Sequence, residues 1–106
     1  MRRQFMFTAT LFLLHGVALG DLKITHKVIG EPVRVEVQDV DNPQVIHKFN
    51  LENGGSKTIS ITGLKCNIRV FSKGMNTLKT EGEFTPNQNL NIQASSGKWV
   101  LKRVSK

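Results

Sequence analysis

The stretch "LKITHKVIGEPVRVEVQ", residues 22–38, decides the fold class that the sequence predicts. Apolar and polar side chains alternate over residues 22–28 and again over residues 33–38. A period of two places every second side chain on the same side of a strand, so each run predicts a strand with one buried face. Gly30-Glu31-Pro32 separates the two runs and is rich in turn formers. The stretch therefore predicts two strands joined by a turn.

The same alternation recurs along the rest of the chain. We expect further strands at residues 45–51, 58–62, 66–71, 77–80, 90–94 and 99–104, with turn-forming segments between them. The three-to-four residue spacing of amphipathic helices is nearly absent. Short strands at this spacing predict an all-β fold, a small antiparallel β-sandwich or barrel of about six to eight strands.

The first twenty residues differ from the rest. A short positive segment at residues 1–3 precedes an apolar run at residues 5–14, and a run that spans a bilayer needs roughly 20 apolar residues. Ala18 and Gly20 are small residues that fit a signal-peptidase site. The sequence thus predicts a cleaved signal peptide over residues 1–20 and one β-sandwich domain over residues 21–106, without a transmembrane segment. We expect a secreted protein, extracellular or, in a bacterium, periplasmic.

Formal charge is unevenly distributed along the chain, whose net charge is +7. Residues 21–52 carry six acidic and four basic side chains, whereas residues 53–106 carry two acidic and nine basic ones. Six of these basic residues form the predicted binding face: Lys65, Arg69, Lys73, Lys98, Lys102 and Arg103. Such a face would attract an anionic macromolecule, namely a host protein, a glycan or a membrane surface. Nucleic acid is the least favoured partner, because the predicted domain has few stacking aromatics and no tyrosine.

Other interpretations of the surface stay open. The basic residues could form a solvated surface without a specific ligand. Short polar side chains form a second candidate surface, which could bind sugars: Thr58, Ser60 and Thr62 with Asn91, Gln93 and Ser95. Strands that face water on one side commonly carry such side chains. The two halves of opposite charge could also attract each other between copies, so we expect a monomer or weak self-association.

Cys66 is the only cysteine of the chain. It shares a predicted strand face with Ile68 and Val70, which favours a buried thiol that packs as a small hydrophobe. An unpaired cysteine in a secreted protein also permits an intermolecular disulfide or a reactive thiol.

Catalytic and metal sites are not expected. His26 and His47 lie on the apolar faces of their strands, and so small a domain has little room for a substrate cleft. Together with Cys66 these histidines lack the spacing of zinc ligands. Asp39 and Asp41 place carboxylates two residues apart, but the remaining positions of a calcium loop are missing and a turn is favoured. We therefore expect a non-enzymatic protein without catalytic residues, metal or cofactor.

The motif "LKCNIRVF", residues 64–71, together with the predicted signal peptide and the short strands, resembles the small secreted β-sandwich effectors of plant-pathogenic fungi, the MAX or ToxB-like group. The resemblance covers the layout of residues 22–72 and carries over the structural position of Cys66. It implies a non-enzymatic virulence effector that binds a host protein, often through a sheet edge or a loop. Together with the charge of the chain, this predicts an effector that engages a host macromolecule through a basic face or a sheet edge. The alternative is a bacterial periplasmic or extracellular module that binds carbohydrate or a surface.

Overall fold

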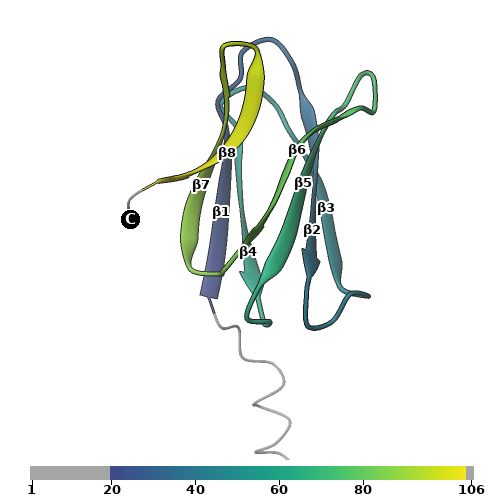
Figure 1. Cartoon of the computed structure of the whole chain (residues 1–106), viewed down its shortest axis with the longest axis vertical. Coiled ribbons are helices and arrows are strands. Elements are labelled where there is room, and N and C mark those ends of the chain that lie inside the picture. The colour runs from purple at the N-terminus through teal and green to yellow at the C-terminus, as the bar shows by residue number, and fades with distance from the viewer. Residues whose placement is uncertain (1–19, 105–106) are drawn as a thin grey trace, which may run out of the picture.

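A computed structural model describes residues 20–104 as two β-sheets packed face to face (Figure 1). The prediction of an all-β sandwich is confirmed, and the two sheets do not close into a barrel. The predicted signal peptide lies outside the described residues except for Gly20, where the first strand begins. Within residues 20–104 no helix is present that could cross a membrane.

Each sheet has four strands. Sheet A has the order β4-β1-β7-β8, formed by β1 (Gly20–His26), β4 (Ser56–Ile61), β7 (Gln88–Ser95) and β8 (Lys98–Val104). Sheet B has the order β3-β2-β5-β6, formed by β2 (Val33–Asp39), β3 (Ile46–Leu51), β5 (Cys66–Ser72) and β6 (Leu78–Phe84).

One pair of neighbouring strands is parallel, which differs from the expected antiparallel arrangement. Every connection reverses the direction of the chain, so the odd-numbered strands all run the same way. The neighbours in sheet B are antiparallel throughout, whereas β1 and β7 pair in parallel, with Lys23 beside Asn89 and Thr25 beside Asn91. Parallel neighbours need a long crossover, and here β2 to β6 provide it by forming sheet B and the edge strand β4.

The core lies between the sheets and consists of the apolar positions of the alternating pattern. In β2 the side chains of Val33, Val35 and Val37 are fully buried, while Arg34 and Glu36 between them are partly exposed. Five other strands, β1, β3, β4, β5 and β7, contribute buried residues in the same way: Leu22, Ile24, Leu51, Ile59, Ile61, Cys66, Ile68, Val70, Leu90 and Ile92. The local alternation thus fixes which side chains face the core.

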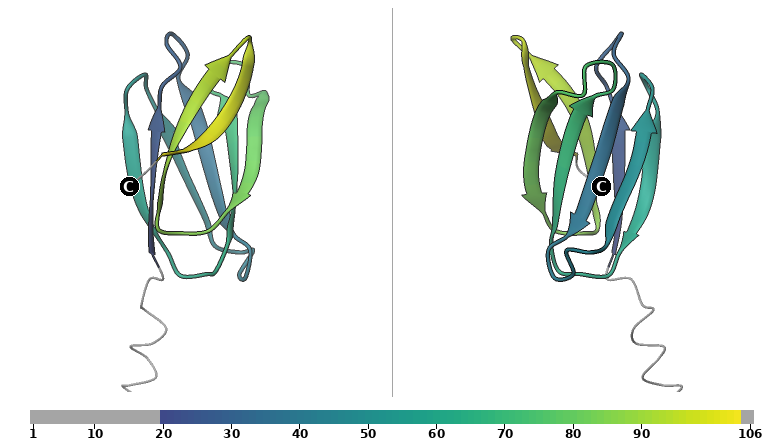
Figure 2. Two further views of the ribbon diagram at one scale, coloured as in Figure 1. Left: turned by 60° about the vertical axis from the view of Figure 1, so that its left-hand side comes forward. Right: turned by 90° about the vertical axis from the view of Figure 1, so that its right-hand side faces the viewer.

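The connections gather at the two ends of the sandwich (Figure 2). The upper end holds the turns after β1, β3, β5 and β7, and the lower end holds those after β2, β4 and β6. At the upper end the N–H of Lys73 donates to the carbonyl of Pro32 at 3.1 Å, which joins the β5–β6 turn to the β1–β2 connection. At the lower end the N–H of Leu64 donates to a carboxylate oxygen of Asp41 at 2.8 Å.

Candidate functional site

The structure divides the six predicted basic residues between the two sheets. Arg69 projects from β5 of sheet B, and Lys65 and Lys73 lie directly before and after that strand. The other three, Lys98, Lys102 and Arg103, belong to β8 at the edge of sheet A. The set therefore does not form one face, and each sheet has to be considered by itself.

On sheet B two of the three predicted cations lie beside carboxylates, whereas Lys73, directly after β5, has no ion-pair partner within residues 20–104. The Nε of Arg69 is 3.5 Å from a carboxylate oxygen of Glu81, and the Nζ of Lys65 is 3.8 Å from one of Glu83. These are the two acidic residues of the basic half, and β6 places both next to β5. The register extends this alternation of charge across the sheet, from Lys48 through Glu36 to Arg69. The outer face of sheet B is consequently close to neutral.

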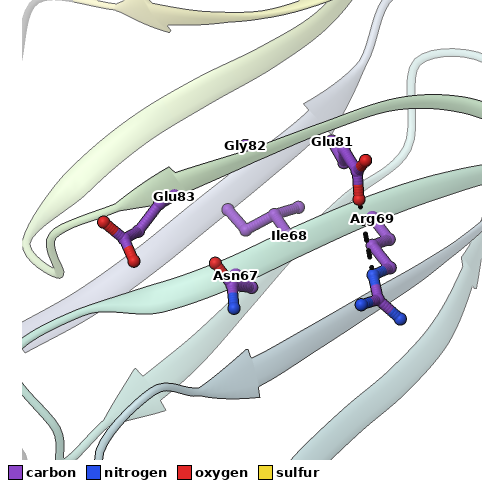
Figure 3. Close-up of a pocket in the computed structure, with 6 residues that line it drawn as sticks. All are labelled: Asn67, Ile68, Arg69, Glu81, Gly82 and Glu83. Atoms are coloured by element: carbon purple, nitrogen blue, oxygen red, sulfur yellow. Dashed lines mark ion pairs between the residues drawn. The ribbon is translucent and has the colours of Figure 1, made fainter.

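Between β5 and β6 this face is hollowed to a volume of about 220 Å³ (Figure 3). Six residues of the two strands line it: Asn67, Ile68, Arg69, Glu81, Gly82 and Glu83. A smaller hollow of about 60 Å³ adjoins it at Asn67 and Arg69 and reaches Ile46 of β3. Both carboxylates of the larger hollow already lie beside cations, so its charged groups are largely satisfied within the protein.

Arg34, on the neighbouring strand β2, also makes its contacts within the protein. The guanidinium of Arg34 lies 4.3 Å from the ring centroid of Phe71, a cation–π contact between β2 and β5. Its Nε donates to Glu36 at 3.2 Å, and another nitrogen donates to the side chain of Asn76. Arg34 therefore holds the β5–β6 turn against sheet B, and its charge is not free for a ligand.

The outer face of sheet A gathers the short polar side chains that the sequence singled out. It presents hydroxyl and amide groups from three strands: Ser56, Thr58 and Ser60 of β4, Thr25 of β1, and Asn89, Asn91, Gln93 and Ser95 of β7. Thr62 does not belong to this face, because it follows β4 and its hydroxyl donates to the carboxylate of Asp39 at 3.4 Å. The predicted polar surface thus exists as one sheet face, with β1 between its two halves.

Lysines flank the amide column of β7 on alternate sides. On the β8 side, Lys102 pairs with Asn91 and Lys98 with Ser95. On the β1 side, Lys23 lies beside Asn89, and Lys27 continues the strand, its N–H donating to the carbonyl of Ile92 at 2.9 Å. Successive outward positions of β7 therefore meet a lysine first on one side and then on the other, with steps of about 6.8 Å along the strand.

The charges on sheet A are not compensated. Within residues 20–104, none of the four lysines has an ion-pair partner. Asp21, at the start of β1, is the one carboxylate that the described strands of sheet A place on this face, and it accepts a hydrogen bond from Ser60 at 3.2 Å. This face therefore combines four lysines with one strand carboxylate, and two of the lysines come from the acidic half.

Sequence reasoning missed Lys23 and Lys27 because it summed charge along the chain rather than across the sheet. The signal was present, since the alternation that buries Leu22 and Ile24 turns Lys23 outward. What the sequence did not show is that β1 pairs with β7, which lies more than sixty residues later.

Trp99 of β8 faces the interior of the sandwich. Its ring stacks with that of His26 at a centroid distance of 6.1 Å, and the Nζ of Lys79 lies 5.6 Å from the Trp99 centroid. Arg103 is exposed at the sheet edge and follows the same alternation as Trp99, so it points away from the outer face. Trp99 is thus a packing residue between β6 and β8, and its ring is turned away from Lys98 and Lys102, which lie on the outer face of the sheet.

The thiol and the two histidines that could have formed a catalytic or zinc site are not brought together. Cys66 begins β5 at the lower end and is fully buried, which confirms the interpretation as an unpaired core thiol. Burial, with smaller contributions from the charges of Asp39 and Glu83, raises its pKa to about 11. His26 ends β1 at the upper end of the other sheet, and its Nε2 bonds to the carbonyl of Glu31. His47 lies on the edge strand β3.

Asp39 and Asp41 serve the turns at the lower end. Asp39 accepts hydrogen bonds from the N–H of Asp41 at 2.9 Å and from the hydroxyl of Thr62, and Asp41 accepts one from the N–H of Leu64. Among residues 20–104 no group of three histidine, cysteine or carboxylate side chains is placed to hold a metal ion. The turn interpretation fits these bonds.

Neither a scan against protein-family models nor a search of curated proteins found a match for this chain.

Proposed function

We propose that this chain is a small secreted binding protein without catalytic activity, and that the outer face of sheet A binds a linear acidic polysaccharide. The observation that carries the proposal is the column of amides on β7 with lysines on alternate sides. Charged groups that the protein does not neutralise attract an anionic ligand over long range. On the outer face of sheet B, by contrast, the predicted cations Lys65 and Arg69 lie beside carboxylates.

The chemistry of the face favours a polysaccharide over a protein. Protein interfaces rely on aromatic and arginine anchors and are depleted in lysine. The outer face of sheet A offers lysines with hydroxyl and amide groups, and its aromatic residue, Trp99, is turned inward. Asn91 and Gln93 each combine donors and an acceptor, which suits the dense hydroxyl groups of a sugar chain. A sugar chain that lies along β7 can direct its acidic groups to both flanks, where Lys23 and Lys102 stand.

The experiment is affinity electrophoresis with a linear polyuronate, a neutral polysaccharide of similar length and polyphosphate, at low and high salt. We expect retention by the polyuronate at low salt, weakening as salt rises because exposed charges are screened over about 8 Å at physiological ionic strength. The neutral polysaccharide should not retain the protein.

Two variants separate this face from charge in general. Lys23→Gln with Lys102→Gln should abolish most of the retention, whereas the matched pair Lys48→Gln with Lys65→Gln removes the same charge from the other sheet and should not. Asn89→Ala with Asn91→Ala should weaken binding to polyuronate more than to polyphosphate, which has no hydroxyl groups along its chain. If both pairs of lysine substitutions reduced retention by the polyuronate equally, net charge alone would explain the binding, and the proposal would be refuted.

The engagement of a host protein, which the resemblance to fungal effectors implies, is the second candidate. The observation in its favour is the outer edge of β8, which has no hydrogen-bonded neighbour strand within residues 20–104 and carries the exposed Val100. An added strand could pair with this edge. A partner protein that is captured equally by the wild type and by the Lys23 and Lys102 variant would favour this candidate.

A further inference from the structure

The upper end of the sandwich exposes two large aliphatic side chains. Ile29, in the connection after β1, is 83% exposed, and Met75, in the turn after β5, is 75% exposed. The two loops are joined by the hydrogen bond from the N–H of Lys73 to the carbonyl of Pro32, and Figure 2 shows both at the same end of the molecule. Neither side chain belongs to the core. The exposed apolar surface of these two residues therefore does not stabilise the fold by burial.

Lysines lie near both residues in the sequence. Lys27 lies two residues before Ile29, and Lys73 lies two residues before Met75. The neighbouring β7–β8 hairpin adds Lys98 at the same end. The carboxylates in these upper connections are Glu31, which is partly buried, and Glu52 after β3. The loops around the two aliphatic residues thus present more positive than negative charge.

We propose that the upper end docks on an anionic lipid bilayer, with Ile29 and Met75 entering the interface and Lys27 and Lys73 meeting lipid headgroups. Peripheral membrane binding combines burial of apolar side chains at the headgroup boundary with attraction of basic residues to anionic lipids. Both loops lie at the same end of the sandwich and are joined by the hydrogen bond from Lys73 to Pro32, so they can enter a headgroup layer together. The lysines again disfavour a protein partner, because lysine is depleted at protein interfaces.

The lower end supplies an internal control, because it also exposes two aliphatic side chains but differs in charge. Leu64 is 68% exposed and Val40 is 36% exposed, and their two loops are joined by the bond from the N–H of Leu64 to Asp41. Here the neighbouring side chains are the carboxylates of Asp39 and Asp41, and Lys65 lies beside Glu83. An anionic surface would repel this end, so docking has a defined orientation.

The proposed membrane surface adjoins the outer face of sheet A and shares Lys27 and Lys98 with its upper margin, but the residues that test the two proposals differ. Lys23 and Lys102 project from the middle of that sheet, whereas Ile29 and Met75 lie in loops at its upper end. Docking by the upper end would leave the amide column of β7 accessible, and the two proposals can fail independently.

The test is sedimentation of the protein with phosphatidylcholine vesicles that either contain or lack phosphatidylserine. We expect binding only to the vesicles with phosphatidylserine. Ile29→Ser with Met75→Ser should weaken it by at least about tenfold, since each apolar side chain adds to interfacial partitioning. Val40→Ser with Leu64→Ser should leave it unchanged. Lys23→Gln with Lys102→Gln should keep most of the vesicle binding while it loses the polyuronate.

A second measurement reports insertion directly. Because Cys66 is buried, a cysteine introduced at position 75 can be labelled selectively with a polarity-sensitive dye. Vesicles with phosphatidylserine should shift the emission of Met75→Cys to the blue and leave that of Leu64→Cys unchanged. The proposal is overturned if the wild type does not bind these vesicles, or if the Ile29 and Met75 variant binds as well as the wild type. It is also overturned if the dye at position 75 and the dye at position 64 show the same change in emission. Thermal unfolding of each variant confirms that it remains folded.

Discussion

The indole of Trp99 stacks with the imidazole of His26 between the two sheets, with ring centroids 6.1 Å apart and planes inclined by 25°. The two residues lie on β8 and β1, and the ammonium of Lys79, from β6 of the other sheet, lies near the indole. Trp99 therefore ties the edge strand of sheet A to the edge strand of sheet B, on the side where the sandwich would otherwise be open.

Replacing Trp99 with alanine should destabilise the fold. The indole is only half-buried, so we expect a loss of about 2 kcal/mol, below the range for a fully buried tryptophan. Denaturant unfolding monitored by circular dichroism measures the change. Val100→Ala is the matched control, because Val100 faces the other side of β8, and an exposed substitution changes stability by at most about 0.5 kcal/mol. Equal stability of the two variants would contradict the role assigned to Trp99.

The sequence analysis did not predict the inward position of Trp99, and it did not predict which strands pair. Which side chains face the core depends on the local period, and residues such as Val33, Val35 and Val37 follow it. Which strands become neighbours depends on packing between segments far apart in the chain. The parallel pairing of β1 with β7 and the ion pair of Arg69 with Glu81 belong to this second class.

The candidate site shows the same division. The polar residues Thr58 and Asn91 were recognised from the sequence, and β-sheet pairing places them on one face. The six basic residues were chosen by position along the chain, and the fold separated them. Lys65 and Arg69 of sheet B lie beside carboxylates. Within residues 20–104, Lys73 after β5 and the three basic residues of β8 have no ion-pair partner. Lys23 could be identified only after β1 was placed beside β7.

The free energy of unfolding should depend on alkaline pH through Cys66. Burial raises the pKa of this thiol from 9.0 to about 11. Below pH 9 the thiol is neutral in both states, and its contribution to stability is complete. Between pH 9 and 11 the unfolded thiol ionises while the folded one stays protonated, so stability falls, by up to about 2 to 3 kcal/mol.

Comparison with Cys66→Ala isolates this effect, because lysines titrate alike in both proteins. The difference in unfolding free energy between the wild type and the variant should decrease as the pH rises from 9 to 11 and stay constant between pH 6 and 8. The native wild type should also react slowly with a thiol reagent at pH 8 and remain a monomer without reductant. Rapid labelling would show that Cys66 is accessible, contrary to its burial here.

Gly63 should not tolerate a side chain. A Cβ atom at this position would lie 2.0 Å from the Oδ1 of Asp39, whose carboxylate holds the turns of the lower end together. Gly63→Ala must displace the carboxylate or the turn, and overpacking of this kind costs about 1 to 3 kcal/mol. Gly74→Ala is the control, because a Cβ there meets no atom within 4 Å. Thermal unfolding of both variants measures the difference in stability. If the Gly63 variant were as stable as the Gly74 variant, the carboxylate of Asp39 would not lie against Gly63.

Lys102 and Arg69 should differ in their effect on the binding of a polyanion, although both are exposed cations of the basic half. Glu81 lies 3.5 Å from Arg69 and offsets its charge, whereas Lys102 has no ion-pair partner within residues 20–104 and stands beside Asn91. Charges at the rim of an interface act mainly on the association rate. We therefore expect Lys102→Gln to slow association with a polyuronate by about threefold or more at low salt, and Arg69→Gln to change the rate by less than about twofold.

Stopped-flow or surface-based kinetics at two salt concentrations measures both association rates. The difference between the rates of the two variants should shrink as salt rises, because screening removes the attraction. Glu81→Gln completes the comparison: it releases the charge of Arg69 and should raise the association rate if proximity to Glu81 is what makes Arg69 ineffective. Equal rates for the Lys102 and Arg69 variants would show that total charge, rather than the outer face of sheet A, governs the encounter.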